Sequence, residues 1–135
     1  MAVQLNHTIV HATDRAATAA HLAEVLGLPE PTTYGPFLVV ELANDVSLDV
    51  MEVARVHAQH YAFLVEDDEF DAIHGRIVER GLDFWADPFE RQPGETNTND
   101  GGRGLYWNAP DGHKLEILTV PYGGWPVTRE EHGPA

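Results

Sequence analysis

A pattern of alternating residues occurs twice in this chain and constrains its fold more than any other feature. Val46–Val53 reads VSLDVMEV, and His113–Val120 reads HKLEILTV. Successive strand residues point to opposite faces of a sheet, so both segments are typical of strands. Each would be apolar on one face and carry an acid on the other, Asp49 in the first and Glu116 in the second. Matching strands predict that the units containing them are also duplicated.

The chain upstream of each segment supports this duplication. LNHTIV at Leu5–Val10 aligns with AQHYAF at Ala58–Phe63, and the alignment sets His7 on His60. A helix-like segment that closes on Gly-Leu follows each of these strands. Each copy therefore supplies a histidine from its first strand and an acid from its last.

The duplication predicts an α+β fold built from two β-α-β-β-β modules that form a mixed sheet. Module one spans residues 1–55, module two spans residues 56–121, and a tail follows at residues 122–135. A chain of 135 residues suits one domain with a sizeable core, so both modules are assigned to a single domain over residues 1–135.

Residue types locate the helices and strands within each module. Thr13 predicts the N-cap of a helix over residues 14–26, with a buried stripe at Ala16, Ala20, Ala23 and Leu26. The acidic cluster Asp67–Glu69 suits the first turn of the second helix, where backbone N–H groups favour negative charge. The buried side of that helix is expected at Phe70, Ile73 and Ile77. The strands before the final one are expected at residues 4–11, near 33, 37–42, 46–51, 57–65, 82–85 and 102–108.

Module two is longer than module one between its histidine and its acid. Most of the extra length falls in the polar, Gly- and Pro-rich segment Asp87–Gly102. Such a segment suits either an active-site loop or a plain surface loop, and the residues leave both open. Arg103, next to it, could orient an anionic substrate or hold the loop in place.

Charge and composition exclude several classes of function. Eight basic and 22 acidic residues give a formal net charge of −14 without a basic stripe, so nucleic acids and anionic membranes are poor partners. The absence of cysteine excludes disulfides, thiolate metal sites and a cysteine nucleophile. Neither a leader peptide nor a membrane-spanning apolar run is recognisable, so a cytoplasmic protein is expected.

Glu116 needs a physical explanation because it lies in mid-strand among apolar residues. Burying an unpaired charge costs several kcal/mol, so this carboxylate either faces water or is paired with a cation. The residues alone leave both possibilities open.

These residues resemble the vicinal-oxygen-chelate superfamily, which includes glyoxalase I, extradiol dioxygenases, fosfomycin-resistance thiol transferases and bleomycin-resistance proteins. The resemblance covers residues 4–120 and nearly the whole chain. It is carried by LNH ending at His7, QHYAF around His60, GRGLY at residues 102–106 and PDGHKLE at residues 110–116. It implies that the sheet curves into a cup around a metal site.

The resemblance implies three metal ligands, His7, His60 and Glu116. Two imidazoles and a carboxylate suit one divalent ion per site, whether iron, nickel, zinc or manganese, and leave coordination positions open for water or substrate. It also implies a homodimer, in which each metal site forms either within one chain or across two.

Two further residues receive catalytic roles by resemblance. Asp49 lies where glyoxalase-like members supply another acidic ligand; it could bind the ion, serve as a general base, or be a buried acid satisfied by hydrogen bonds. Tyr106 matches a tyrosine near the metal-bound substrate in extradiol dioxygenases, where a hydroxyl can donate to a developing oxyanion, or it is a wall residue. His113 is expected to form hydrogen bonds within its own turn.

The resemblance implies a metal-dependent enzyme that acts on a small oxygen-chelating substrate. A glyoxalase-like lyase or isomerase suits the short two-module chain best, and an extradiol-type dioxygenase using iron(II) comes next. Thiol transfer to fosfomycin matches the ligands, but the Lys- and Ser-rich loop expected for it is missing. Outside catalysis, the alternative is a drug-binding protein of the bleomycin-resistance kind, and metal content separates the two.

Overall fold

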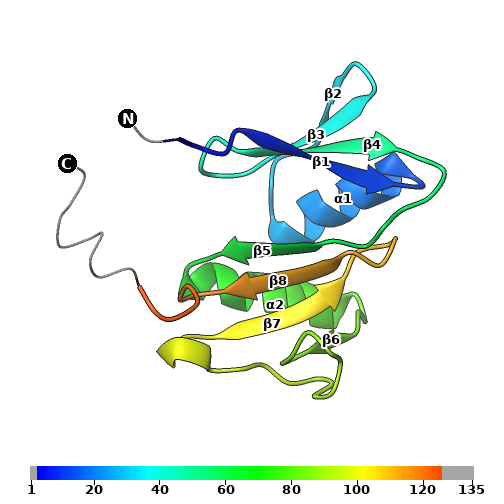
Figure 1. The fold of residues 1–135 in the computed structure, drawn as a ribbon. Coiled ribbons are helices and arrows are strands. Elements are labelled where there is room, and N and C mark those ends of the chain that lie inside the picture. The colour runs from blue at the N-terminus through cyan, green and yellow to red at the C-terminus, as the bar shows by residue number, and fades with distance from the viewer. Residues whose placement is uncertain (1–2, 126–135) are drawn as a thin grey trace. The chain divides into compact units, whose positions relative to one another are not determined.

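The computed structural model describes residues 3–125 of the chain. Contacts divide these residues into two compact units, one formed by the chain up to Gln59 with Asn108–His113, the other by His60–Trp107 with the chain from Lys114 onward. Each unit holds a four-stranded mixed sheet and one helix (Figure 1), which confirms the predicted α+β fold. The part of the predicted tail from residue 126 onward lies outside the described residues.

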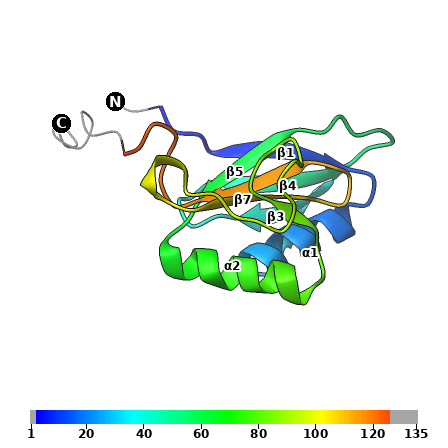
Figure 2. The ribbon, with the colours of Figure 1, turned by 90° about the horizontal axis from the view of Figure 1, so that it is seen from below.

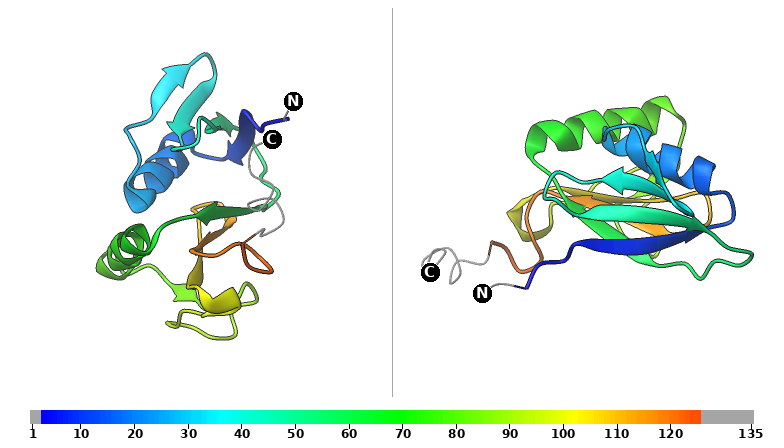
Figure 3. Two further views of the ribbon diagram at one scale, coloured as in Figure 1. Left: turned by 90° about the vertical axis from the view of Figure 1, so that its left-hand side faces the viewer. Right: turned by 90° about the horizontal axis from the view of Figure 1, so that it is seen from above.

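The sheet of the first unit has the strand order β1-β4-β3-β2. Its elements are β1 (His7–Ala12), α1 (Arg15–Leu26), β2 (Thr32–Tyr34), β3 (Phe37–Glu41) and β4 (Ser47–Glu52). Strand β1 runs parallel to β4, and the other neighbours are antiparallel. Helix α1 lies along one face of this sheet, where Val10, Val40 and Val50 are buried (Figure 3). Strand alternation places His7 and Asp49 on the opposite face.

Helix α1 has a different N-cap from the predicted one. Asp14 is the N-cap, and its carboxylate accepts a hydrogen bond from Ala17 N at 3.1 Å. Thr13 instead donates its N–H and its hydroxyl to the Asp111 carboxylate, at 2.9 and 2.7 Å. The prediction for Thr13 was wrong because the Asp14 carboxylate accepts the helix N–H, while the Thr13 side chain bonds to Asp111.

The buried face of α1 also differs from the prediction. The buried residues are Thr18, Ala19, Leu22, Ala23 and Val25. Of the predicted stripe, Ala23 alone is fully buried, and Ala16 is exposed. This helix is rich in alanine on all sides, so its periodicity does not select one face.

The sheet of the second unit has the strand order β5-β8-β7-β6, with β5 parallel to β8. Its elements are β5 (His60–Leu64), α2 (Asp67–Glu79), β6 (Phe84–Trp85), the 3-10 helix η1 (Asn99–Gly101), β7 (Gly104–Asn108) and β8 (Lys114–Leu118). Helix α2 lies along one face of this sheet (Figure 2) and buries Phe70, Ile73 and Ile77, as predicted. Among the described residues, no helix is long and apolar enough to cross a membrane.

The two sheets share one pattern of strand pairing. In each, the histidine of the first strand lies opposite the residue two positions before the acid of the last strand. His7 is opposite Ser47 in one sheet, and His60 is opposite Lys114 in the other. Asp49 and Glu116 therefore occupy equivalent backbone positions, as the repeat predicted.

The start of the Asp87–Gly102 segment is held by its own hydrogen bonds. The Asp87 carboxylate accepts from the N–H groups of residues 89, 91 and 92, at 3.2, 2.9 and 2.8 Å. Glu90, which has a left-handed φ of 60°, accepts from Lys114 Nζ of β8 at 2.7 Å. Lys114 Nζ also lies 4.8 Å from the centre of the Trp85 ring. The start of the segment is therefore attached to the sheet through Lys114.

The side chain of His113 bonds outside its own turn. This residue is 1% exposed, and its Nδ1 accepts from Gln59 N at 3.0 Å. Its Nε2 donates to His11 O at 2.7 Å. The prediction of a ring bonded within the turn was wrong, because both partners come from parts of the chain that are remote in sequence.

Candidate metal and catalytic site

Glu116 is buried in the centre of β8 with 2% of its surface exposed. Its Oε1 lies 2.9 Å from Nε2 of His60, on the neighbouring strand β5. The His60 side chain is 43% exposed, whereas the Glu116 side chain is 3% exposed. Two of the three predicted ligands, His60 and Glu116, therefore lie together within the second unit.

Tyr106 of β7 lies beside this pair. Hydrogen bonds from Thr119 N to Arg103 O and from Ala109 N to His113 O frame the antiparallel pairing of β7 with β8. This register places Tyr106 opposite Glu116. The Tyr106 ring is 5.9 Å from the His60 ring, edge to face, and the residue is 4% exposed.

Tyr106 is held in its protonated form. Burial is the largest cause that raises the pKa of its hydroxyl, followed by a hydrogen bond to Tyr122 and by the negative charge of Glu116. A phenol that keeps its proton is a hydrogen-bond donor at physiological pH. This is the state required of a group that stabilises a developing oxyanion.

Tyr122 belongs to the same cluster, and the sequence did not reveal it. Its hydroxyl donates to Glu116 Oε1 at 2.7 Å, from a position six residues further along the chain. Burial and this hydrogen bond raise its pKa. It lies in the segment assigned to the tail, beyond the last strand, where alternation makes no prediction. The one available signal was a tyrosine shortly after the last strand and before two glycines.

The spacing of His60 and Glu116 fits a shared divalent ion. Nitrogen and oxygen ligands bind such ions at about 2.0–2.2 Å, so two ligands at right angles lie about 3 Å apart. The measured 2.9 Å between His60 Nε2 and Glu116 Oε1 matches this spacing. One imidazole and one buried carboxylate also suit the first-row ions expected from the sequence.

His7 and Asp49, the predicted residues of the first unit, share the face of the sheet that α1 leaves uncovered. His7 Nδ1 lies 2.8 Å from Asn6 Oδ1, which assigns the proton to Nδ1 and makes Nε2 the basic nitrogen. Asp49 is half-buried and accepts from the Ser47 hydroxyl at 2.7 Å. The structure thus groups His60, Tyr106 and Glu116 in one unit and His7 with Asp49 in the other.

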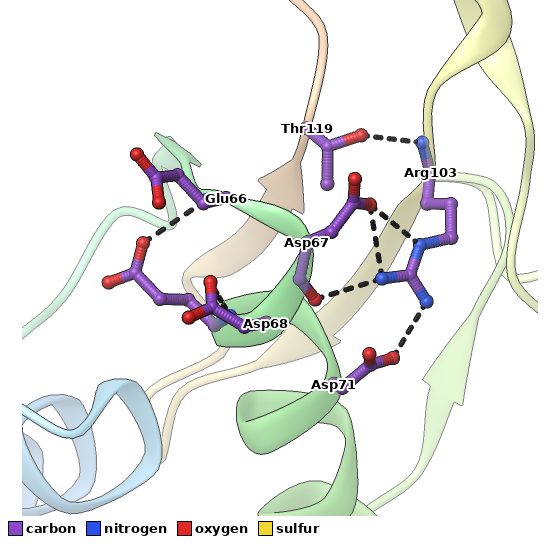
Figure 4. A network of polar contacts seen from close by, with 7 residues as sticks. Glu66, Asp67, Asp68, Asp71, Arg103 and Thr119 are labelled. Carbon is purple, nitrogen blue, oxygen red and sulfur yellow. Dashed lines mark hydrogen bonds and ion pairs between the residues drawn. The ribbon is translucent and has the colours of Figure 1, made fainter.

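Arg103 holds helix α2 to β7 (Figure 4). Its guanidinium donates to Asp71 Oδ1 at 2.7 Å and to Asp67 O at 2.9 Å. The guanidinium carbon lies 4.4 Å from the centre of the Phe70 ring. The hydrogen bond with Asp71 raises the pKa of Arg103 and lowers the pKa of Asp71. The guanidinium therefore holds helix α2, a role that is not among those predicted for Arg103 from the sequence.

Three exposed carboxylates at the start of α2 also lie close together. Glu66, Asp68 and Glu69 each bring one oxygen within 4.8 Å of the others. Glu69 accepts from Glu66 N at 3.1 Å, and Asp68 accepts from Glu69 N at 2.9 Å (Figure 4). These acids cap the helix, which accounts for the acidic cluster that the sequence placed in this first turn.

Comparison with known proteins identifies close relatives. The solved structure of oxidase ChaP-H1 is 68% identical, covers 91% of this chain and 100% of that chain, and superposes with a TM-score of 0.89. Metallothiol transferase FosB of Shouchella clausii is 34% identical over 98 residues, or 70% of this chain, and the chain spans 61% of that protein's length. Glutathione transferase FosA of Serratia marcescens is 27% identical over 97% of this chain and 99% of that protein.

No protein-family model matches the chain. The relatives, the two β-α-β-β-β modules and the repeat-equivalent positions of Asp49 and Glu116 agree with one another. The chain belongs to the vicinal-oxygen-chelate superfamily.

Proposed function

We propose that this protein is a divalent-metal-dependent oxidase that uses dioxygen on a small substrate with two neighbouring oxygen atoms. The observation that carries the proposal is the 68% identity to oxidase ChaP-H1 over 91% of the chain. The His60–Glu116 pair supports it, because the two side chains offer ligand atoms at the spacing of one ion. The identity to an oxidase ranks the extradiol-type reaction ahead of the lyase or isomerase that the sequence alone favoured.

The proposed ligands are His60, Glu116 and His7. His7 is included because it holds the repeat position of His60 and has Nε2 as its basic nitrogen. Two histidines and one carboxylate are the ligand type of iron(II) oxygenases, with open positions for substrate and dioxygen. When bound, the ion would supply Lewis acidity toward the substrate oxygens and electrons toward dioxygen.

Tyr106 and Asp49 are the proposed catalytic residues. Tyr106 would donate its proton-bearing hydroxyl to a substrate oxygen on which negative charge develops. Asp49 would accept the proton that a substrate hydroxyl loses on binding. Metal binding by Asp49→Asn distinguishes a base from the alternative role of Asp49 as a ligand. If Asp49 is a ligand, the substitution should weaken metal binding. If Asp49 is only a base, the metal affinity should stay unchanged.

Oxygen uptake tests the proposal. The chelator-treated protein is reloaded in separate samples with iron(II), nickel, zinc or manganese and mixed with catechol in an oxygen electrode. The iron(II) sample is expected to consume oxygen above the rate of iron(II) alone. Glu116→Gln, which keeps the side-chain volume but removes the charge, should lose this uptake. Tyr34→Phe is the matched control, since Tyr34 lies in β2 and is 75% exposed.

The same samples distinguish the competing functions. The hemithioacetal of methylglyoxal and glutathione probes the lyase or isomerase, which the proton-transfer pair Asp49 and Tyr106 would also suit. Turnover of this compound without oxygen uptake would replace the oxidase with that second candidate. A protein that takes up none of the four ions would point instead to a drug-binding protein of the bleomycin-resistance kind.

A homodimer remains a prediction from the family resemblance, and a cytoplasmic location remains a prediction from the sequence. Sedimentation of the metal-loaded protein tests the first. If each site draws ligands from two chains, dilution to monomer should release the ion. A monomer that keeps its ion would show that each site forms within one chain.

A further inference from the structure

We propose that Tyr122 is a positioning residue of the metal site, whose hydroxyl fixes the Glu116 carboxylate in the orientation that coordination requires. This inference rests on the proposed metal site and adds to it a residue outside the two modules' strands. Its basis is the hydrogen bond of 2.7 Å from the Tyr122 hydroxyl to Oε1, the same oxygen that lies 2.9 Å from His60 Nε2.

The backbone around Tyr122 is built to bring its hydroxyl back to β8. Gly124 N donates to Pro121 O at 2.8 Å, which closes a turn around Tyr122. Gly123 and Gly124 both have left-handed φ angles, 75° and 87°, which glycine adopts without steric cost. Asp100 Oδ2 accepts from Gly123 N at 3.2 Å and so attaches this turn to the 3-10 helix η1.

The same end of β8 is packed too closely against β7 to move freely. A Cβ on Gly102 would lie 2.7 Å from Thr119 Oγ1 and 2.7 Å from Val120 Cγ2. Thr119 Oγ1 also accepts from Arg103 N at 2.9 Å. The residues that lead from β8 into the Tyr122 turn are therefore packed against Gly102 and Arg103, just before β7.

The polar end of Tyr122 and its ring have different surroundings. The residue is 66% exposed, whereas the carboxylate that its hydroxyl contacts is 2% exposed. An exposed tyrosine would gain little from packing at such a place. Its hydrogen bond to a buried carboxylate does have an effect, because it restricts rotation of the carboxylate. The lone pairs of Glu116 that Tyr122 does not use stay directed toward His60 and the proposed ion.

Tyr122 also connects the ligand with the proposed catalytic tyrosine. Tyr106 lies opposite Glu116 on β7, and both Tyr122 and Glu116 contribute to raising its pKa. The residue that contacts the ligand carboxylate therefore also influences the proposed catalytic donor. Hydrogen-bond partners of metal ligands typically contribute about 10–100-fold in metal affinity.

Manganese(II) titration of the chelator-treated protein by calorimetry tests the inference. Tyr122→Phe removes only the hydroxyl, and we expect its Kd for manganese(II) to rise about 10–100-fold above that of the wild type. Tyr34→Phe should leave Kd unchanged. The d–d absorption of the cobalt(II)-loaded protein should also shift in Tyr122→Phe, because the orientation of the Glu116 ligand changes.

Each result has a separate meaning. A Tyr122→Phe variant with a lower Tm but an unchanged Kd and cobalt spectrum would overturn the positioning role and leave a purely structural one, with the metal site intact. Tighter binding in the variant would also overturn it, since the hydroxyl would then compete with the ion. If the wild type binds neither manganese(II) nor cobalt(II), the proposed metal site and this inference are both wrong.

Discussion

The proposed metal site centres on one residue, Glu116, and its environment explains why a strand can bury an acid. The carboxylate is 2% exposed and has two partners on a single oxygen, His60 Nε2 and the Tyr122 hydroxyl. A buried carboxylate is tolerated when hydrogen bonds or a cation compensate for lost hydration. The two contacts supply the first form of compensation, and the proposed ion would supply the second.

His113 is a second buried polar residue, and its two hydrogen bonds stabilise the fold. Replacing it by alanine removes the partners of Gln59 N and His11 O and leaves a cavity where a ring was 1% exposed. We expect His113→Ala to lower the free energy of unfolding by about 3 kcal/mol. Urea denaturation followed by circular dichroism measures this. His57→Ala, at an exposed position, is the control, and equal effects of the two substitutions would contradict the account.

Among the elements, the β7–β8 hairpin depends on a glycine. The Gly102 backbone approaches Thr119 and Val120 so closely that an added Cβ would meet atoms at 2.7 Å. Crowding of this kind in a packed region costs about 1–3 kcal/mol, so Gly102→Ala should destabilise the protein by that amount. Gly75→Ala offers a matched control, because nothing lies within 4 Å of its added Cβ and the residue is inside α2.

The control should change stability in the opposite direction. Alanine is favoured over glycine inside a helix by about 0.5–1 kcal/mol, so Gly75→Ala is expected to stabilise the protein. Thermal denaturation of Gly102→Ala and Gly75→Ala measures the change in stability of each variant. Two destabilised variants, or two neutral ones, would show that the described packing does not determine their stability.

The attachment of α2 through Arg103 predicts a dependence on pH. The hydrogen bond from Arg103 lowers the pKa of Asp71 below its ordinary value. A carboxyl with a lower pKa in the folded state contributes stability above its unfolded pKa and loses it as the pH falls through its folded pKa. Asp71→Asn should therefore have a lower Tm than the wild type at neutral pH.

This difference in Tm should disappear below the folded pKa of Asp71, where the wild-type carboxyl is also uncharged. Thermal scans of both proteins from neutral pH down to below pH 3.8 measure it. Glu79→Gln, at the other end of α2, is the control for the loss of one negative charge. A gap between Asp71→Asn and the wild type that persists unchanged in acid would contradict the role given to the ion pair.

For the molecule as a whole, the repeat in the sequence was enough to predict the two modules and the equivalence of Asp49 with Glu116. Alternation and repeat spacing are local properties that strand geometry preserves. Other features depend on contacts that no local pattern encodes. The partners of His113 are 54 and 102 residues away, and Thr13 bonds to a residue 98 positions away.

Tyr122 shows the same limit within the candidate site. His60, Tyr106 and Glu116 could be predicted because they lie on strands at repeat or family positions. Tyr122 reaches Glu116 through a turn whose geometry depends on two left-handed glycines and on Asp100. The alternating pattern of the strand ends before that turn begins. No periodicity in the sequence could therefore predict that the Tyr122 hydroxyl lies at Glu116.

The central claim, that His60 and Glu116 hold a catalytic metal ion, is tested most directly by metal content. The wild type, His60→Ala and Glu116→Gln are purified without chelator or added metal, and their metals are counted by mass spectrometry. We predict about one divalent ion per wild-type chain and a loss of that ion in both variants, because each removes one of the two ligand atoms that lie 2.9 Å apart. Iron would favour the oxidase, whereas zinc or nickel would favour the lyase. A wild type that is free of metal and takes up no added ion would contradict the account.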